Sequence, residues 1–248
     1  MSQPPSLSGL SVVGRTPLVE DGPGLPEYRT KSDVVYARLR HLVLTAEIRP
    51  GDVIDQASLS ESLGVSRMPL RQALIRLASE GLVYLSPHHS ATVVPLLARD
   101  IEEIYSTRDA LESLLIRTAT PKLTPRDDVE LAGLCREAGD PAIRMAPRHF
   151  SAADRRFHTR LYQVAGFPRA LQYFMNLRDL SDRFVAFYYS QERPSRDADA
   201  AFSTNCHDEM LEACRARDVD AAVAAMRTDL WRTAEFLLEV AESSPPGD

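Results

Sequence analysis

Ser66-Arg67-Met68-Pro69-Leu70-Arg71 follows directly on the turn Leu63-Gly64-Val65, and this stretch decides how the N-terminal part of the chain folds. Ser66 is a good N-cap residue, and Pro69 still falls in the first helical turn, where its missing N–H costs nothing. The sequence therefore predicts a helix that begins at about Arg67. Two arginines, Arg67 and Arg71, lie one turn apart at its N-terminal end.

Apolar residues then recur at intervals of three and four, which predicts one buried helix face made of Leu70, Ala73, Leu74 and Leu77. This pattern leaves Arg67, Met68, Arg71 and Gln72 exposed near the N-terminus. A positive helix dipole with two guanidinium groups suits phosphates and guanine edges. Arginines at this spacing are also common as solvated surface residues, so the pair alone does not establish a DNA reader.

The flanking sequence strengthens the interpretation that this helix binds nucleic acid. Ser58 is expected to cap a short helix over residues 59–63, and Gly64 supplies the tight turn of a helix-turn-helix. After the helix stops at Glu80-Gly81, residues 82–85 and 92–94 read as two strands around a polar tip. With a preceding helix over residues 31–46, these elements predict a winged helix.

The same residues resemble the DNA-binding domain of the GntR family of bacterial transcription regulators over about residues 31–95. The resemblance lies in Ile48-Arg49-Pro50-Gly51, in residues 59–74 and in residues 77–83. It implies that Arg67 and Arg71 contact an operator, that the first turn of their helix (Ser66, Pro69 and Gln72) contributes to DNA binding, and that the wing tip at His88 and His89 approaches the minor groove. The family usually has a glycine where Ser90 stands, so the wing contacts are less specified.

Composition sets the outer bounds. The 248 residues include 44% hydrophobic residues, enough for real cores, and carry a net charge of −6. Residues 31–94 carry seven Lys and Arg against six Asp and Glu, so the excess acid lies elsewhere. With no apolar run of about 18 residues and no secretory signal, we expect a cytoplasmic protein with no membrane contact. Three cysteines without paired spacing are expected to be reduced structural thiols.

From Asp100 onward the apolar spacing predicts only helices. The segments are one long helix from Ile101 to Leu115, then about 125–138, 140–165, 168–190, 196–216 and 219–241. The expected fold is therefore mainly α, with a winged helix-turn-helix followed by an all-α antiparallel bundle. We predict a disordered arm at 1–28, a DNA-binding domain at 29–95, a helical domain at 96–243 and a tail at 244–248.

A second group of candidate functional residues lies in these helices. Asp154 and His158 are four residues apart on one helix face, so a carboxylate and an imidazole can converge on one point. His207 and Asp229 lie on two later helices. A single His on a helix is more often a structural residue than a ligand, so the Asp-x-x-x-His spacing alone is a weak metal signal.

Residues 100–112, 154–158 and 207–213 resemble the FCD effector-binding domain of the FadR branch of the same family. The resemblance implies that one Asp and three His bind a divalent metal and that Arg108 faces the carboxylate of a small organic acid. Asp229 stands where the third histidine would fall. An aspartate can still coordinate, so we expect a divalent ion of the Zn, Ni or Mn class, and the oxygen-rich set favours a harder ion. The alternative is a degenerate site that binds no ion.

Three residues are candidates for the effector site. Arg108 faces the effector by resemblance, but its i, i+4 spacing from Glu112 also fits a plain intrahelical ion pair. Tyr162 lies on the same helix line as Asp154 and His158, where it either borders a cavity or packs in the core.

These observations predict a transcription regulator rather than an enzyme. A homodimer would bind double-stranded DNA at a pseudo-palindromic operator, and a small carboxylate in the helical domain would change its affinity. The chain shows no nucleophile–base set and no phosphate loop, which disfavours the rival reading as a metal-dependent all-α enzyme with a passive winged helix. The same regulator without a metal is a further alternative.

Overall fold

The computed structural model describes residues 30–86, 90–95, 97–190 and 196–243. The chain divides into two compact units, the first comprising the described residues up to 42 together with 51–94, and the second comprising residues 43–50 and those from 95 onward. The predicted arm at 1–28, the predicted tail at 244–248 and the wing-tip residues His88 and His89 lie outside the described residues.

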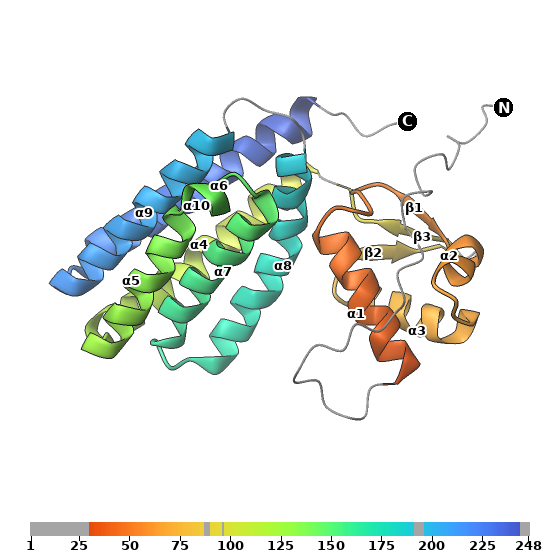
Figure 1. The fold of residues 1–248 in the computed structure, drawn as a ribbon, viewed down its shortest axis with the longest axis horizontal. Coiled ribbons are helices and arrows are strands. Elements are labelled where there is room, and N and C mark those ends of the chain that lie inside the picture. The colour runs from red at the N-terminus through yellow and green to blue at the C-terminus, as the bar shows by residue number, and fades with distance from the viewer. Residues whose placement is uncertain (1–29, 87–89, 96, 191–195, 244–248) are drawn as a thin grey trace. The chain divides into compact units, whose positions relative to one another are not determined.

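The N-terminal unit is a winged helix-turn-helix, as predicted (Figure 1). Its sheet has the order β1-β3-β2, and both pairs are antiparallel, with Val53 opposite Thr92 and Val83 opposite Val93. The elements of this unit are α1 (Lys31–Leu44), β1 (Val53–Asp55), α2 (Gln56–Ser62), α3 (Arg67–Ser79), β2 (Val83–Leu85) and β3 (Ser90–Val93).

The buried face of α3 is the one that the spacing predicts, since its four apolar residues are fully buried: Leu70, Ala73, Leu74 and Leu77. Val35 and Leu39 of α1 are also fully buried in this unit. Gly64, in the turn before α3, has φ +63°, a conformation that costs an L side chain roughly 1 kcal/mol or more. The glycine therefore lets α2 and α3 meet in a tight turn.

Local details of this unit differ from the prediction. Helix α2 begins at Gln56 instead of Leu59 because Asp55 caps it, accepting a hydrogen bond from the Ser58 backbone N–H at 2.8 Å. Ser66 occupies the N-cap position of α3 with extended backbone, but its side chain makes no capping hydrogen bond to the described residues. Strand β1 was not predicted, because three residues are too few to show an alternating pattern.

The C-terminal unit is an all-helical bundle, which confirms the predicted fold class. Helix α4 packs against α7, α8 and α10, and α9 packs against α5 and α10 (Figure 1). A 3₁₀ turn at Thr120–Lys122 follows α4. The helices are α4 (Ala98–Ala119), α5 (Pro125–Gly139), α6 (Pro141–Arg144), α7 (Pro147–Gln163), α8 (Pro168–Ser190), α9 (Arg196–Ala216) and α10 (Val219–Ser243). None of the helices in the described ranges is long and apolar enough to cross a membrane.

The single helix predicted over 140–165 is wrong. The structure has two helices there, because Pro147 lacks the N–H that a continuous helix would need and instead opens α7 at its first position. Asp140 caps the short α6 by accepting a hydrogen bond from the Ala142 N–H at 2.8 Å. Helix α4 also begins at Ala98, slightly before the expected start at Asp100.

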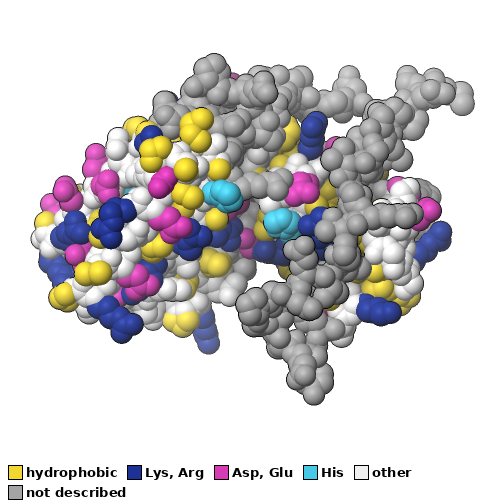
Figure 2. All heavy atoms as spheres, in the orientation of Figure 1, with side chains coloured by type: hydrophobic (Ala, Val, Ile, Leu, Met, Phe, Trp, Pro, Cys, Tyr) yellow, Lys and Arg dark blue, Asp and Glu magenta, His cyan; other side chains and the backbone are white. Residues whose placement is uncertain are grey.

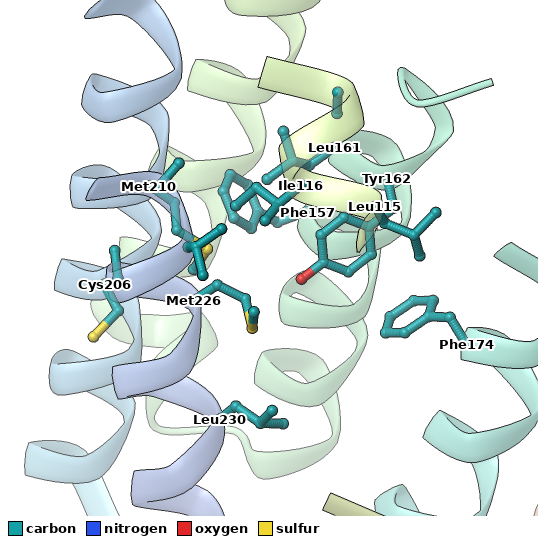
Figure 3. Close-up of a cluster of buried hydrophobic side chains, with 14 of the residues drawn as sticks. Leu115, Ile116, Phe157, Leu161, Tyr162, Phe174, Cys206, Met210, Met226 and Leu230 are labelled. Carbon is teal, nitrogen blue, oxygen red and sulfur yellow. The ribbon is translucent and has the colours of Figure 1, made fainter. Parts of the chain in front are cut away.

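Buried apolar side chains from α4, α7, α8, α9 and α10 form the core of the bundle (Figure 3). Phe157 and Tyr162 of α7 lie at its centre, with Met210 of α9 and Met226 of α10 beside them. The Tyr162 hydroxyl brings a polar atom into this cluster, so it requires a hydrogen-bond partner. That partner belongs to the functional site.

Replacing Leu74 by Ala is expected to lower the free energy of unfolding of the N-terminal unit by about 2–5 kcal/mol, because the side chain is fully buried and leaves a cavity. The neighbouring Ile75 is 49% exposed, so Ile75→Ala is the matched control and is expected to cost about 0.5 kcal/mol. Urea unfolding followed by circular dichroism measures both. Equal losses for the two variants would contradict this packing.

Candidate functional site

Two carboxylates and two imidazoles converge inside the bundle from three helices. Asp154 and His158 come from α7, His207 from α9 and Asp229 from α10, and all four are buried. One potential ligand atom from each lies within 4.8 Å of the others. The structure thus brings together all four residues that the sequence proposed as metal ligands.

The distances between these atoms fit a shared cation. His207 Nε2 lies 3.1 Å from Asp154 Oδ1 and 3.2 Å from His158 Nε2, and His158 Nε2 lies 3.3 Å from Asp229 Oδ2. Two ligands each about 2.1 Å from one ion are ~3.0–3.4 Å apart in octahedral or tetrahedral geometry. The donor set has two nitrogens and two oxygens, which suits a divalent ion of the Zn, Ni or Mn class.

A buried chain of hydrogen bonds reaches His158 at its Nδ1 atom. The Tyr162 hydroxyl lies 3.4 Å from His158 Nδ1 and donates to Glu112 Oε2 at 2.7 Å. Glu112 in turn accepts from Arg108 Nε at 2.8 Å. If Nδ1 donates its proton to the Tyr162 oxygen, Nε2 is left as an acceptor facing the other three ligands.

The electrostatics of the cluster favour positive charge. Burial acts to raise the pKa of Asp154, but the charge of Arg178 and hydrogen bonds from both histidines hold that pKa well below its usual range. Burial acts to lower the pKa of His158, yet hydrogen bonds to Asp154 and Asp229 raise it to about 9. The two carboxylates therefore stabilise a positive charge at the point where the four side chains meet.

Arg178 of α8 connects this cluster to a second aspartate. Its Nη2 donates to Asp154 Oδ2, and its Nε donates to Asp182 Oδ1 at 2.7 Å. Asp154 therefore offers one oxygen to Arg178 and the other, Oδ1, to the histidines. This division leaves Oδ1 available as a single-atom ligand for a metal.

A cavity of about 60 Å³ is lined by two of the four residues, Asp154 and Asp229. Arginines and aspartates line it in equal numbers: Arg108, Arg178, Arg232, Asp154, Asp182 and Asp229. Apolar side chains such as Phe150, Phe202 and Phe236 complete the wall. Apolar side chains together with converging charged groups are typical of sites that bind small molecules.

The three residues proposed for the effector site occupy different positions. Arg108 lines the cavity and forms the buried ion pair with Glu112 that its spacing indicates. It also donates to Ser181 Oγ at 3.1 Å. Glu112 and Tyr162 are buried but are not among the lining residues. They lie behind the cavity, where they connect Arg108 to His158.

Among the cavity residues that the sequence reasoning missed are Tyr105, Arg178, Asp182 and Arg232. Arg178 and Asp182 have an i, i+4 spacing on α8, which reads as an ordinary surface ion pair. Their burial is the informative property, and it arises from contacts of α8 with α4 and α7 that local spacing does not show.

In the N-terminal unit, Arg67, Arg71 and Gln72 are exposed at the start of α3, as is Ser66, whereas Pro69 is partly buried. Within the part of the chain that the structure describes, neither Arg67 nor Arg71 is held in an ion pair. Arg76, at the other end of α3, lies 3.5 Å from an Asp33 carboxylate oxygen and 3.7 Å from the centre of the Tyr36 ring. The two N-terminal arginines are therefore available to a ligand, and Arg76 is occupied.

Comparisons with known proteins agree with both units. The profile of the bacterial regulatory proteins of the gntR family matches residues 31–93, and that of the FCD domain matches residues 103–230. An uncharacterized HTH-type transcriptional regulator in an unstable DNA locus of Streptomyces ambofaciens is 27% identical over 217 residues, covering 88% of this chain and 89% of its own. The HTH-type transcriptional repressor RspR of Escherichia coli is 24% identical over 210 residues, covering 85% of this chain and 90% of its own.

The solved structure of Escherichia coli McbR/YncC has the same fold, with a TM-score of 0.72 and 21% sequence identity over 86% of this chain and 99% of that one. The matching families and relatives are transcription regulators and not enzymes, which confirms the expectation that this chain is not an enzyme. The chain belongs to the GntR family of bacterial regulatory proteins, with a C-terminal FCD domain, and is a DNA-binding transcription regulator.

Proposed function

We propose that this regulator binds a pseudo-palindromic operator as a homodimer and that a small organic acid controls its affinity for DNA. The acid binds in the cavity of the FCD domain, beside a divalent metal held by four residues. The observation that carries this proposal is the convergence of Asp154, His158, His207 and Asp229, two of which, Asp154 and Asp229, also line a cavity together with Arg108. In this proposal residues 29–95 read DNA, residues 96–243 bind the acid, and the protein acts in the cytoplasm.

The DNA-reading residues are those at the start of α3. Arg67, Arg71 and Gln72 reach base edges in the major groove, while Ser66 and Pro69 place the first turn against a phosphate. His88 and His89 of the wing approach the minor groove. Acidic and basic side chains are interspersed on the visible face of the helical unit (Figure 2). DNA binding therefore depends on the arginines at the start of α3 and not on a positive field of the whole protein.

The charge balance of the cavity explains why an acid fits. The three lining arginines and three lining aspartates cancel, and Glu112 behind the wall adds one negative charge. A bound divalent ion adds two positive charges, which makes the site as a whole attractive to an anion. Arg108 is the cavity arginine that the resemblance assigns to the carboxylate of the effector.

Asp154 Oδ1, His158 Nε2, His207 Nε2 and Asp229 Oδ2 would hold the metal. When bound, the ion supplies a positive charge to which an acid oxygen is attracted. Because Asp229 provides an oxygen where the family has a nitrogen, the donor set favours the Mn end of the Zn, Ni and Mn class. The two ligating carboxylates also neutralise the ion, so the acid depends more on the arginines.

Control of DNA binding requires that the acid has different affinities for the two arrangements of the α3 helices in the dimer. Such a coupling is typically worth ~1–3 kcal/mol. The direction of control, repression or activation, follows from which arrangement the acid prefers.

Arg71→Ala is expected to weaken operator binding by roughly 5- to 100-fold, because a guanidinium that reads a base edge contributes ~1–3 kcal/mol. Arg76→Ala is the matched control, since it removes the same charge from the same helix at a position engaged with Asp33 and Tyr36. Fluorescence anisotropy with the operator fragment, at a fixed physiological salt concentration, measures both. Unchanged affinity in Arg71→Ala would argue against the DNA-reading role of α3.

Asp229→Asn is expected to lower the affinity for Mn²⁺ at least about tenfold, because it removes a charged oxygen ligand from the donor set. Glu209→Gln is the control, because it removes the same charge from an exposed position on α9. Isothermal titration of the chelator-treated protein with Mn²⁺ gives both affinities.

Asp229→His tests the same site by introducing a nitrogen ligand, whereas Asp229→Asn only removes a charged oxygen ligand. It restores a third imidazole and is expected to raise the preference for Zn²⁺ over Mn²⁺ by about tenfold or more, since imidazole suits Zn better than Mn. Competitive titration of the two ions measures this ratio. If neither Asp229 variant changes the affinity for either ion, the four residues do not form a metal site and the regulator works without one.

A further inference from the structure

Tyr105 is a cavity residue with a buried polar atom. The side chain is fully buried on α4, and it lines the cavity together with Arg108 and Arg178. Its hydroxyl is shielded from solvent and has no hydrogen-bond partner among the described residues. Leaving a buried hydroxyl unpaired is costly, so native proteins rarely do so without a functional reason.

Charged side chains lie near this tyrosine. The Arg108 guanidinium carbon lies 5.0 Å from the centre of the Tyr105 ring. Arg108, Arg178, Asp182 and Glu112 all act electrostatically on the hydroxyl, although burial has the largest effect and raises its pKa to about 12. The group is therefore a neutral phenol near neutral pH, able to donate one proton to an oxygen that arrives with a ligand.

Tyr162 shows the contrast within the same bundle. Its hydroxyl is equally buried, but it is used by the fold, since it donates to Glu112 at 2.7 Å. Of these two buried tyrosines, the one that lines the cavity has the unused hydroxyl, and the one behind the cavity has a partner. This difference points to a ligand as the missing partner of Tyr105.

We propose that the Tyr105 hydroxyl donates a hydrogen bond to a second oxygen of the effector, and that Tyr105 thereby selects a short hydroxycarboxylic acid over the corresponding acid without the hydroxyl. This inference rests on the proposed function, because it assumes that a carboxylate occupies the cavity. The cavity volume of about 60 Å³ favours a short acid over a long one. A site built to bond an oxygen rejects analogues that lack it, because its own polar group is then left unpaired.

The test uses two pairs of acids that differ by one hydroxyl group: malate with succinate, and lactate with propionate. The full-length protein, at one fixed Mn²⁺ concentration, is titrated with each acid by calorimetry. In at least one pair, the hydroxy acid is expected to bind about tenfold more tightly than its partner, as one hydrogen bond allows. Tyr105→Phe is expected to reduce this preference to within about twofold without weakening the binding of the acid that lacks the hydroxyl.

Tyr173→Phe is the matched control, because it removes the same atom from a side chain that is 63% exposed and outside the cavity lining. It is expected to retain the wild-type preference. The proposal would be overturned if the preference persists in Tyr105→Phe. It would also be overturned if the wild type shows no preference in either pair, or if none of the four acids binds.

Melting temperatures of the ligand-free variants separate a binding role from a structural one. Tyr105→Phe is expected to melt at or above the wild-type temperature, because its hydroxyl stabilises nothing in the fold. Tyr162→Phe is expected to melt lower, because it leaves Glu112 without a donor. If Tyr105→Phe is destabilised as much as Tyr162→Phe, the hydroxyl has a structural partner and the proposal is wrong.

The two levels of proposal fail in different ways. If hydroxy acids bind in a Tyr105-dependent manner but leave operator affinity unchanged, the inference about Tyr105 holds and the regulatory function does not. If an acid changes operator affinity while Tyr105→Phe keeps the wild-type preference, only the inference about Tyr105 fails.

Discussion

The compensation of buried charge is the constraint on which the helical unit depends. Asp154, Arg178 and Asp182 are all buried in the bundle, where an isolated charge would cost several kcal/mol. Each is instead bonded to a neighbour of opposite sign, and Arg178 joins the two aspartates. The polar interior is therefore a connected network whose members hold one another in place across α7 and α8.

This network fixes the positions of the polar side chains of the site, which a ligand-binding site requires. His158 is fixed from one side by Asp154 and Asp229 and from the other by the Tyr162 hydroxyl. A surrounding shell of apolar residues, including Phe157 stacked 4.4 Å from the centre of the His207 ring, restricts the imidazoles further. Preorganised ligands of this kind lose little entropy when they bind an ion or a small acid.

The parts of the fold that sequence could predict are those governed by local rules. The apolar spacing of α3 identified its buried face, and the i, i+4 spacing placed Asp154 and His158 together. His207 and Asp229 could be added to the same site only through the family resemblance, because their approach depends on how α9 and α10 pack. The cavity roles of Tyr105 and Arg178 were unpredictable for the same reason, since burial and missing partners are properties of the assembled bundle.

Helix α4 contributes both Tyr105 and Arg108 to the cavity, and it is also the first helix after the winged unit. Strand β3 ends at Val93 and α4 begins at Ala98, so only four residues separate the sheet of the wing from the helix that carries these two cavity residues. So short a connection contains few rotatable backbone bonds, and Pro95 fixes one of them. One covalent path from the cavity to the winged unit therefore has little conformational freedom of its own.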